Sequence, residues 1–424
     1  MNSSVIHPNV YKALYILLAT GLASRCIEKG VEAGFIGIAV LLSIYIAIKE
    51  FTGTRHTALT EKVKTSTHTP LMIVLPIMLT SWGISSYFGI NPDYSLKKWG
   101  EVLALVLGGA ILYIGIRRSP LSALEKFPRY VMWAGASFSL LLILESLHLI
   151  PWVSENIRNL SKGPLHTQIR SFSTVAAILI PFAWVEALKK DRLKYWILPS
   201  IIFIASIVAG GRSGWLALGV SAAIFAFIYP WKTVARPLVN KIIFGAQFVL
   251  GSIVGGLLYR IVVGNEFFEY RLGIASGDGA SGGSGRIEIW KFALDKFTEA
   301  PWMGIGVKGF RHLDFTGYEV TSTMHPHNAI LELMVETGII GTILAITFAC
   351  LLMYRLGKSI YNNKSYTHPR IHNLAIACVC SLIAFLTASL TLTSIFHAWW
   401  LTYFVVLYII IDSAHIAIHR KVIT

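Results

Sequence analysis

Long apolar segments separated by short basic connections run through this chain, and that pattern leaves few folds open to it. A membrane-spanning helix needs about 17–25 mostly apolar residues. By this measure the sequence predicts spans near residues 10–25, 31–48, 70–90, 99–116, 129–150, 173–188, 195–210, 214–231, 242–263, 338–356, 374–394 and 399–417. We therefore expect an all-α, polytopic integral membrane protein with about 12 transmembrane helices.

The charge content supports this class and argues against a nucleic-acid-binding protein. Only 14% of the residues are charged, whereas soluble domains hold about 25%. The net charge is +15, but Lys and Arg occur in short runs between apolar segments, and no basic helix or aromatic platform accompanies them. We predict membrane lipids as partners and no nucleic acid.

The basic runs also predict an orientation. Lys and Arg concentrate in alternate connections, at 49–64, 117–126, 189–194, 232–241 and 355–370. Cytoplasmic loops carry this excess, so we expect both termini to be cytoplasmic. We read residues 1–424 as a single transmembrane domain whose first apolar segment is a spanning helix, not a cleaved targeting peptide. The long hydrophilic connection, 264–337, then lies on the opposite side, and loops of that length are often functional.

A short amphipathic helix is predicted inside this loop. Ser284 could cap the start of this helix. Apolar residues at helical spacing predict its buried face: Ile287, Trp290, Leu294 and Phe297. Arg286 would lie in the first turn, where a bound anion would meet both the guanidinium and unpaired backbone N–H groups. The alternative is an ordinary solvated arginine.

Two further segments could contact an anionic ligand. Arg212 follows Gly210 and Gly211 in a turn between two spans. It could bind an anion, or anchor the helix at the lipid headgroups. The glycine-spaced turn 301–310 carries Lys308, and Arg311 follows it. We count Lys308 and Arg311 as candidate substrate-binding residues, although such a turn can also be only a tight connection.

The segment His325-Pro326-His327-Asn328 is the candidate source of a general base. Pro326 suits the first position of a helix that Gly338 could end. His327 would then lie in the first turn, where the helix dipole favours the neutral imidazole that a base requires. Metal binding by the H-x-H pair and an absence of function are the alternatives. No third ligand follows at metal spacing, so we predict no metal and no cofactor.

Several of these stretches resemble the bacterial O-antigen ligase/O-antigen polymerase superfamily. The resemblance covers about the C-terminal half and rests on Gly210–Gly214, Ser284–Arg286 with Trp290, Pro301 to Phe310, and His325–Asn328 followed by Leu331, Glu336 and Gly338. It implies a type C membrane glycosyltransferase, metal-independent and inverting. The donor would be a glycan linked to undecaprenyl diphosphate.

Carried over by position, the resemblance also implies residue roles. Arg212 and Arg286 would contact the donor diphosphate, with Asn328 nearby, and His327 would be the base, with His325 as the fallback. The expected function is an O-antigen ligase of the bacterial inner membrane, which transfers a polysaccharide to lipid A–core within the periplasmic loop 264–337.

Two other functions stay open. One is an O-antigen or capsule polymerase, which would extend a lipid-linked glycan. The other is a transporter or flippase, which would carry ionisable residues near the bilayer midplane and two related halves. Of the carboxylates, we expect only Glu145 and Glu186 well inside spans, both toward helix ends, and no internal repeat is visible.

Overall fold

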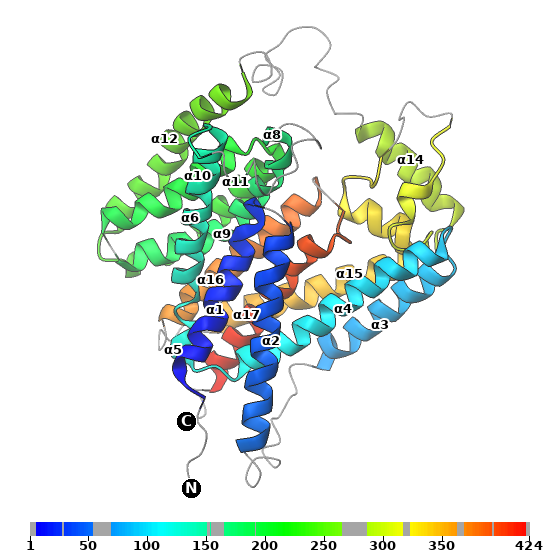
Figure 1. The fold of residues 1–424 in the computed structure, drawn as a ribbon, viewed down its shortest axis with the longest axis horizontal. Helices are drawn as coiled ribbons and strands as arrows, with labels where there is room; N and C mark the ends of the chain where they lie inside the picture. Colours follow the sequence, from blue (N-terminus) through cyan, green and yellow to red (C-terminus); the bar gives the residue numbers. More distant parts are fainter. Residues whose placement is uncertain are drawn as a thin grey trace.

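The protein is a bundle of helices (Figure 1). The computed structural model describes residues 6–27, 29–53, 69–150, 153, 165–190, 192–264, 286–316, 323–362, 369–391 and 394–420, and no strand occurs in these ranges. The longer helices are α1 (Pro8–Ala23), α2 (Lys29–Gly53), α3 (Thr69–Tyr87), α4 (Pro92–Arg117), α6 (Phe127–Ser146), α9 (Arg170–Lys190), α10 (Ile197–Val208), α11 (Arg212–Ile228), α12 (Pro237–Val263), α14 (Arg286–Glu299), α15 (Ala329–Asn362), α16 (Pro369–Ser389) and α17 (Ala398–Arg420). Short helical segments connect them: η1 (Ser24–Cys26), α5 (Leu121–Leu124), α8 (Leu165–Gln168), η3 (Leu193–Trp196), η4 (Trp231–Thr233) and η6 (Gly309–His312).

Each predicted span is a helix, which confirms an all-α polytopic membrane protein. Among the described residues, 8 helices are long and apolar enough to cross a membrane. They cover Val31–Lys49, Pro70–Tyr87, Pro92–Arg117, Leu121–Ser146, Arg170–Lys190, Pro237–Val263, Ala329–Arg355 and Pro369–Ser389. Shorter apolar helices cover Leu193–Val208, Arg212–Ile228 and Ala398–Ser413. Large apolar side chains such as Leu250 and Ile261 are exposed on the outside of the bundle, as contact with lipid requires.

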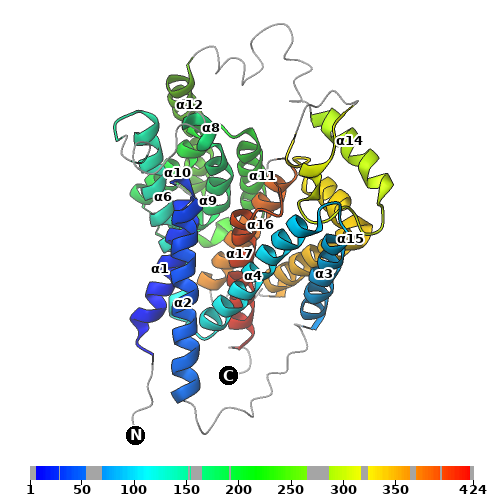
Figure 2. The ribbon, with the colours of Figure 1, turned by 45° about the vertical axis from the view of Figure 1, so that its right-hand side comes forward.

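The two ends of the bundle differ. Helix α1 begins and α17 ends at one end, whereas α14 lies at the other (Figures 1 and 2). We call these the terminal end and the α14 end. Helix α12 runs to the α14 end (Figure 2).

Helix α9 forms the centre of the bundle. It packs against α6, α10, α11 and α16, and nearly all of its residues are buried. Trp184 on α9 is fully buried, and its indole N–H donates to Gln247 Oε1 of α12 at 2.8 Å. In a membrane, an apolar helix surface can contact lipid as favourably as another helix. Hydrogen bonds between helices, such as this one, therefore help to hold the bundle together.

The Gly251/Gly255 pair brings α12 close to α10. A side-chain carbon at Gly251 would lie 2.6 Å from the Phe203 ring, and one at Gly255 would lie 2.7 Å from Ile207. Only glycine permits this approach.

Helix α15 is broken at Gly338, which has φ 64° and ψ −175°. The predicted end of a helix at Gly338, before the span that follows it, is therefore confirmed. The first segment, Ala329–Thr337, lies toward the α14 end and carries the residues that follow the histidine pair (Figure 1).

The expectation that only Glu145 and Glu186 lie inside spans is wrong. Asp412 of α17 is buried and pairs with Arg355 of α15 at 2.6 Å, and the Tyr113 hydroxyl of α4 donates to the same carboxylate at 2.6 Å. A carboxylate inside a bundle is tolerated when a cation and a hydroxyl satisfy it. This network ties three helices together.

Candidate active site

Arg286 is the first described residue of helix α14, and the buried face of this helix is not the predicted one. Ile287 and Leu294 are 55% and 45% exposed. The buried residues are Ile289, Phe292 and Ala293, with Trp290 and Phe297 partly buried beside them. The Phe292 ring stacks on Phe315 at 4.4 Å and meets Phe310 at 5.7 Å, so the packing partner selects this face. The predicted cap, Ser284, lies outside the described residues.

The glycine-spaced turn 301–310 closes onto the break in α15. Ile305 N–H donates to the Val335 carbonyl and Gly306 N–H to the Glu336 carbonyl, each at 2.9 Å. These carbonyls precede the Gly338 break, where the helix leaves carbonyl groups unpaired. Gly304 has φ 70°, and a side-chain carbon there would lie 2.5 Å from the Gly338 backbone. The tight-connection interpretation of this turn accounts for its glycines.

The histidine turn is not helical, which corrects the prediction of its local structure. Helix α15 begins at Ala329, and Asn328 Oδ1 accepts the N–H groups of Ile330 and Leu331 at 3.0 and 3.3 Å. Asparagine is a strong N-cap, so it starts the helix in place of Pro326. His327 precedes the cap with φ 56°, in the left-handed region.

His325 is held as a neutral imidazole. It is 9% exposed, and its Nδ1 accepts the backbone N–H of His327 at 3.2 Å. In a neutral ring whose Nδ1 accepts, the proton resides on Nε2. Burial and the neighbouring His327, Lys308, His397 and Arg286 lower the pKa of His325 to about 2.

Four basic side chains lie near His325 at the α14 end, and we call these four the cationic cluster: Arg286, Lys308, His327 and His397. The His325 ring lies 4.1 Å from the His327 ring and 6.0 Å from the His397 ring. His397 lies between α16 and α17. Sequence analysis missed it because a single histidine in a short connection has no distinctive spacing.

Buried carboxylates lie beneath Lys308. Its ammonium is 3.9 Å from Glu332 Oε1, and its backbone N–H donates to Glu336 Oε2 at 2.6 Å. Both carboxylates are fully buried. Burial lowers the pKa of Lys308, although both glutamates oppose that shift. The contacts of Lys308 favour a role in holding the turn onto α15, and its role in substrate binding stays a prediction.

Arg311 lies on the exposed rim near Lys308. It donates to the Tyr94 hydroxyl and lies 5.2 Å from the centre of the Tyr94 ring. Its guanidinium remains accessible from outside the bundle.

Arg212 is exposed at the first turn of α11, and hydrogen bonds involve residues near it and near the cluster on either side of the connection between α16 and α17. Ser213 donates to the Thr391 carbonyl at 3.1 Å, and Ile395 N–H donates to Glu332 at 2.8 Å. No hydrogen bond or ion pair joins Arg212 to either His325 or His327 in the described part of the chain. The structure thus brings Arg286, Lys308, His325 and His327 together. Arg212 is not among the groups that act on His325.

The described residues contain no group of three His, Cys, Asp or Glu that could hold a metal ion. The cationic cluster can instead attract an anion through its own side chains, while a half-buried imidazole, His327, lies within it.

These features define a polytopic, all-helical membrane protein with a histidine-bearing cationic site at one end of its bundle. Residues 197–346, from α10 into α15, match the family described as O-antigen ligase. This range includes Arg212, Arg286 and the histidine turn.

Three relatives agree with this match. A Rickettsia conorii protein named "Putative polysaccharide ligase" is 25% identical over 53% of this chain and 53% of its own length. A Rickettsia bellii protein of the same name is 21% identical over 78% and 77%. The O-antigen ligase of Pseudomonas aeruginosa is 23% identical over 68% and 66%. The chain thus spans about half the length of the Rickettsia conorii relative, and its similarity is to the O-antigen ligase superfamily.

Proposed function

We propose that this protein is an O-antigen ligase. It transfers a polysaccharide from undecaprenyl diphosphate to lipid A–core at the periplasmic face of the bacterial inner membrane. The match to the O-antigen ligase family supports this function, and the convergence of Arg286, His325 and His327 is the observation that carries it. Both chain termini face the cytoplasm in this proposal, and the loop 264–337 holds the site.

The reaction is an inverting substitution at the anomeric carbon. The acceptor hydroxyl oxygen forms a bond to that carbon while the bond to the diphosphate oxygen breaks. His327 accepts the hydroxyl proton. Arg286 and Arg212 stabilise the charge on the departing undecaprenyl diphosphate. The two guanidiniums supply the positive charge, so the proposed step needs no metal ion.

The geometry of the histidine pair favours His327 over His325 as the base. Nδ1 of His325 is occupied by the His327 N–H, and Nε2 carries the proton. A ring in that state can donate a hydrogen bond but has no vacant nitrogen to accept a proton. We therefore assign His325 a positioning role, which holds the backbone of His327.

The test is His327→Asn in the purified protein, reconstituted with a lipid-linked donor and lipid A–core. Asparagine tolerates the left-handed backbone of this position but cannot act as a base. Transfer should fall about 100- to 10,000-fold, with donor binding retained. The matched control is His312→Ala, an exposed histidine outside the cluster, which should leave transfer unchanged. Full activity of His327→Asn would exclude His327 as the base.

The same assay separates the ligase from a polymerase. A ligase should elongate lipid A–core and leave a second lipid-linked glycan unmodified. If only the lipid-linked glycan is extended, the protein is a polymerase.

A further inference from the structure

The turn that carries Arg212, residues 210–214, is held against α9 by a buried serine. Ser173 of α9 is fully buried, and its hydroxyl donates to the Gly211 carbonyl at 3.0 Å. The Ser173 Oγ also lies 3.2 Å from the Ser206 Oγ of α10, and the Ser206 hydroxyl donates to the Ser173 carbonyl at 3.2 Å. One serine therefore joins α9 both to α10 and to the start of α11.

The carbonyl that Ser173 binds is the one at which α11 begins. Gly211 is the N-cap residue of α11, and its carbonyl accepts the N–H groups of Gly214 and Trp215 at 2.9 and 3.1 Å. Glycine has no side chain that could cap the helix, as serine or asparagine would. Ser173 thus fixes, from a neighbouring helix, the residue that directly precedes Arg212.

Two glycines of the turn are required by this contact. A side-chain carbon at Gly211 would lie 2.8 Å from the Ser173 Cβ, and one at Gly214 would lie 2.2 Å from the Ser173 Oγ. Only glycine allows the backbone to approach another helix so closely. These two glycines therefore serve the packing of the turn onto α9.

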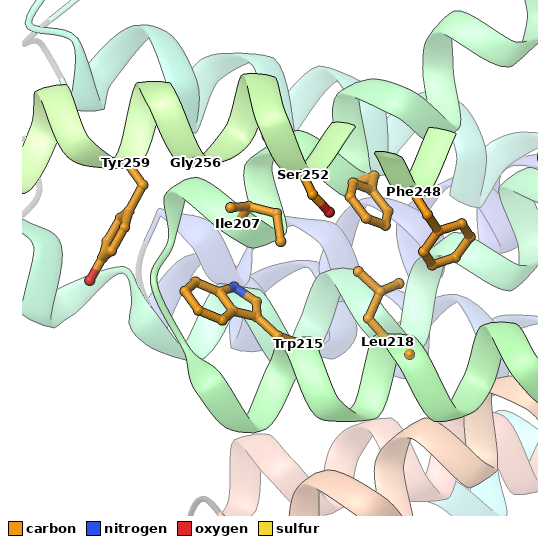
Figure 3. A pocket seen from close by; sticks show the side chains of 9 residues that line it. Ile207, Trp215, Leu218, Phe248, Ser252, Gly256 and Tyr259 are labelled. Atoms are coloured by element: carbon orange, nitrogen blue, oxygen red, sulfur yellow. The ribbon is translucent and has the colours of Figure 1, made fainter. Parts of the chain in front are cut away.

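Helices α10 and α12 hold the other side of the turn. The Trp215 indole N–H donates to the Ser206 carbonyl at 3.0 Å, and the Trp215 ring meets the Tyr259 ring of α12 edge to face at 6.0 Å. Figure 3 shows both rings lining one apolar pocket. Gly210 has φ 72°, and a side-chain carbon there would lie 2.5 Å from the Tyr259 ring. The backbone on both sides of Arg212 is thus fixed, while the Arg212 side chain is exposed.

We propose that Ser173 is a positioning residue for Arg212, because it holds the backbone from which the guanidinium reaches the donor diphosphate. The proposal rests on the proposed function, which gives Arg212 that ligand. A guanidinium binds phosphate through a planar fork of N–H groups, so the direction of the side chain matters as well as its charge. Ser173 lies outside residues 197–346, the range that matches the family.

A double-mutant cycle tests this role. Ser173→Ala, Arg212→Gln and the double variant are placed in nanodiscs, and the binding of undecaprenyl diphosphate and the unfolding temperature are measured for each. Ser173→Ala should fold, since Ser206 still donates to the carbonyl of residue 173 and the Gly211 carbonyl keeps its two N–H donors from α11.

Arg212→Gln should bind undecaprenyl diphosphate about 10- to 100-fold more weakly, because it loses charged hydrogen bonds. Ser173→Ala should bind it about three- to tenfold more weakly, because the guanidinium is less well directed. The double variant should bind no more weakly than Arg212→Gln alone, since Ser173 acts through Arg212.

The matched control is Ser221→Ala. Ser221 is also fully buried, and from α11 it donates to the Cys380 carbonyl of α16 at 3.1 Å. Its loss should lower the unfolding temperature about as much as Ser173→Ala does, but binding should match the wild type. An equal loss of binding in both serine variants would overturn the proposal, because any missing hydrogen bond between helices would then suffice.

Two further results would overturn it. One is wild-type binding by Ser173→Ala, and the other is a loss of the same size when Ser173→Ala is added to Arg212→Gln. Wild-type glycan transfer is measured separately. If the two variants are coupled in binding but the wild type transfers no glycan, the proposed function fails while the role of Ser173 stands. If transfer proceeds and the two losses are additive, the role of Ser173 alone fails.

Discussion

At the scale of single residues, the site depends on how one histidine holds another. His325 is buried, and its Nδ1 accepts the N–H of His327, whose backbone is left-handed. The pair and its role as a candidate base were predicted from H-x-H. The protonation state of His325 was not predicted, because it depends first on burial and then on Lys308, His397 and Arg286, which are distant in sequence.

A buried neutral histidine predicts acid sensitivity. The pKa of His325 is lowered from 6.5 to about 2, so below pH 6.5 the unfolded state binds a proton that the folded state excludes. The free energy of unfolding should therefore fall as pH drops below that value. His325→Asn should lose part of this dependence. The measurement is the unfolding temperature in detergent, compared between neutral and mildly acidic buffer. An equal fall of the unfolding temperature in the wild type and in His325→Asn would contradict the account.

At the scale of elements, local patterns predicted most helices, and packing decided the details that they missed. The apolar spans are properties of contiguous sequence, so their positions could be predicted. The face of α14 could not, because two apolar stripes compete and only the rings of Phe310 and Phe315 select between them. The start of α15 was misplaced because Pro326 and Asn328 both suit a helix beginning.

The break at Gly338 is predicted to be essential for the docking of turn 301–310. Gly338 has φ 64°, and a side-chain carbon there would lie 2.2 Å from the Trp302 carbonyl oxygen. Gly338→Ala should lower the free energy of unfolding by about 1–3 kcal/mol or more. Gly357→Ala, in open space on the same helix, is the control and should not destabilise the protein. Equal unfolding temperatures in the two variants would exclude a special role for Gly338.

At the scale of the whole molecule, charged residues occupy separate regions of the bundle. The cationic cluster lies at the α14 end, whereas Arg355 and Asp412 pair between helices α15 and α17. The all-α, polytopic class and the basic character of the connections were evident from composition and order. The Arg355–Asp412 pair could not be predicted, because Arg355 lies in α15 and Asp412 in α17, with the whole of α16 between them in the sequence.

The buried pair predicts a large loss when one partner is removed. Asp412→Ala should cost about 3–5 kcal/mol, because Arg355 would stay buried without its carboxylate. The double variant Arg355→Met, Asp412→Leu should recover most of that loss, since apolar side chains need no partner. Unfolding monitored by intrinsic fluorescence provides the comparison, and a double variant as unstable as the single one would refute it.

The central claim is that Arg212, Arg286 and His327 serve one substrate. A cryo-electron microscopy structure with undecaprenyl diphosphate bound tests this most directly. The account predicts a diphosphate that contacts both guanidiniums, with His327 facing the terminal phosphate, which carries the glycan in the donor. A diphosphate bound away from Arg286 and His327, or arginines that remain in separate regions, would contradict it.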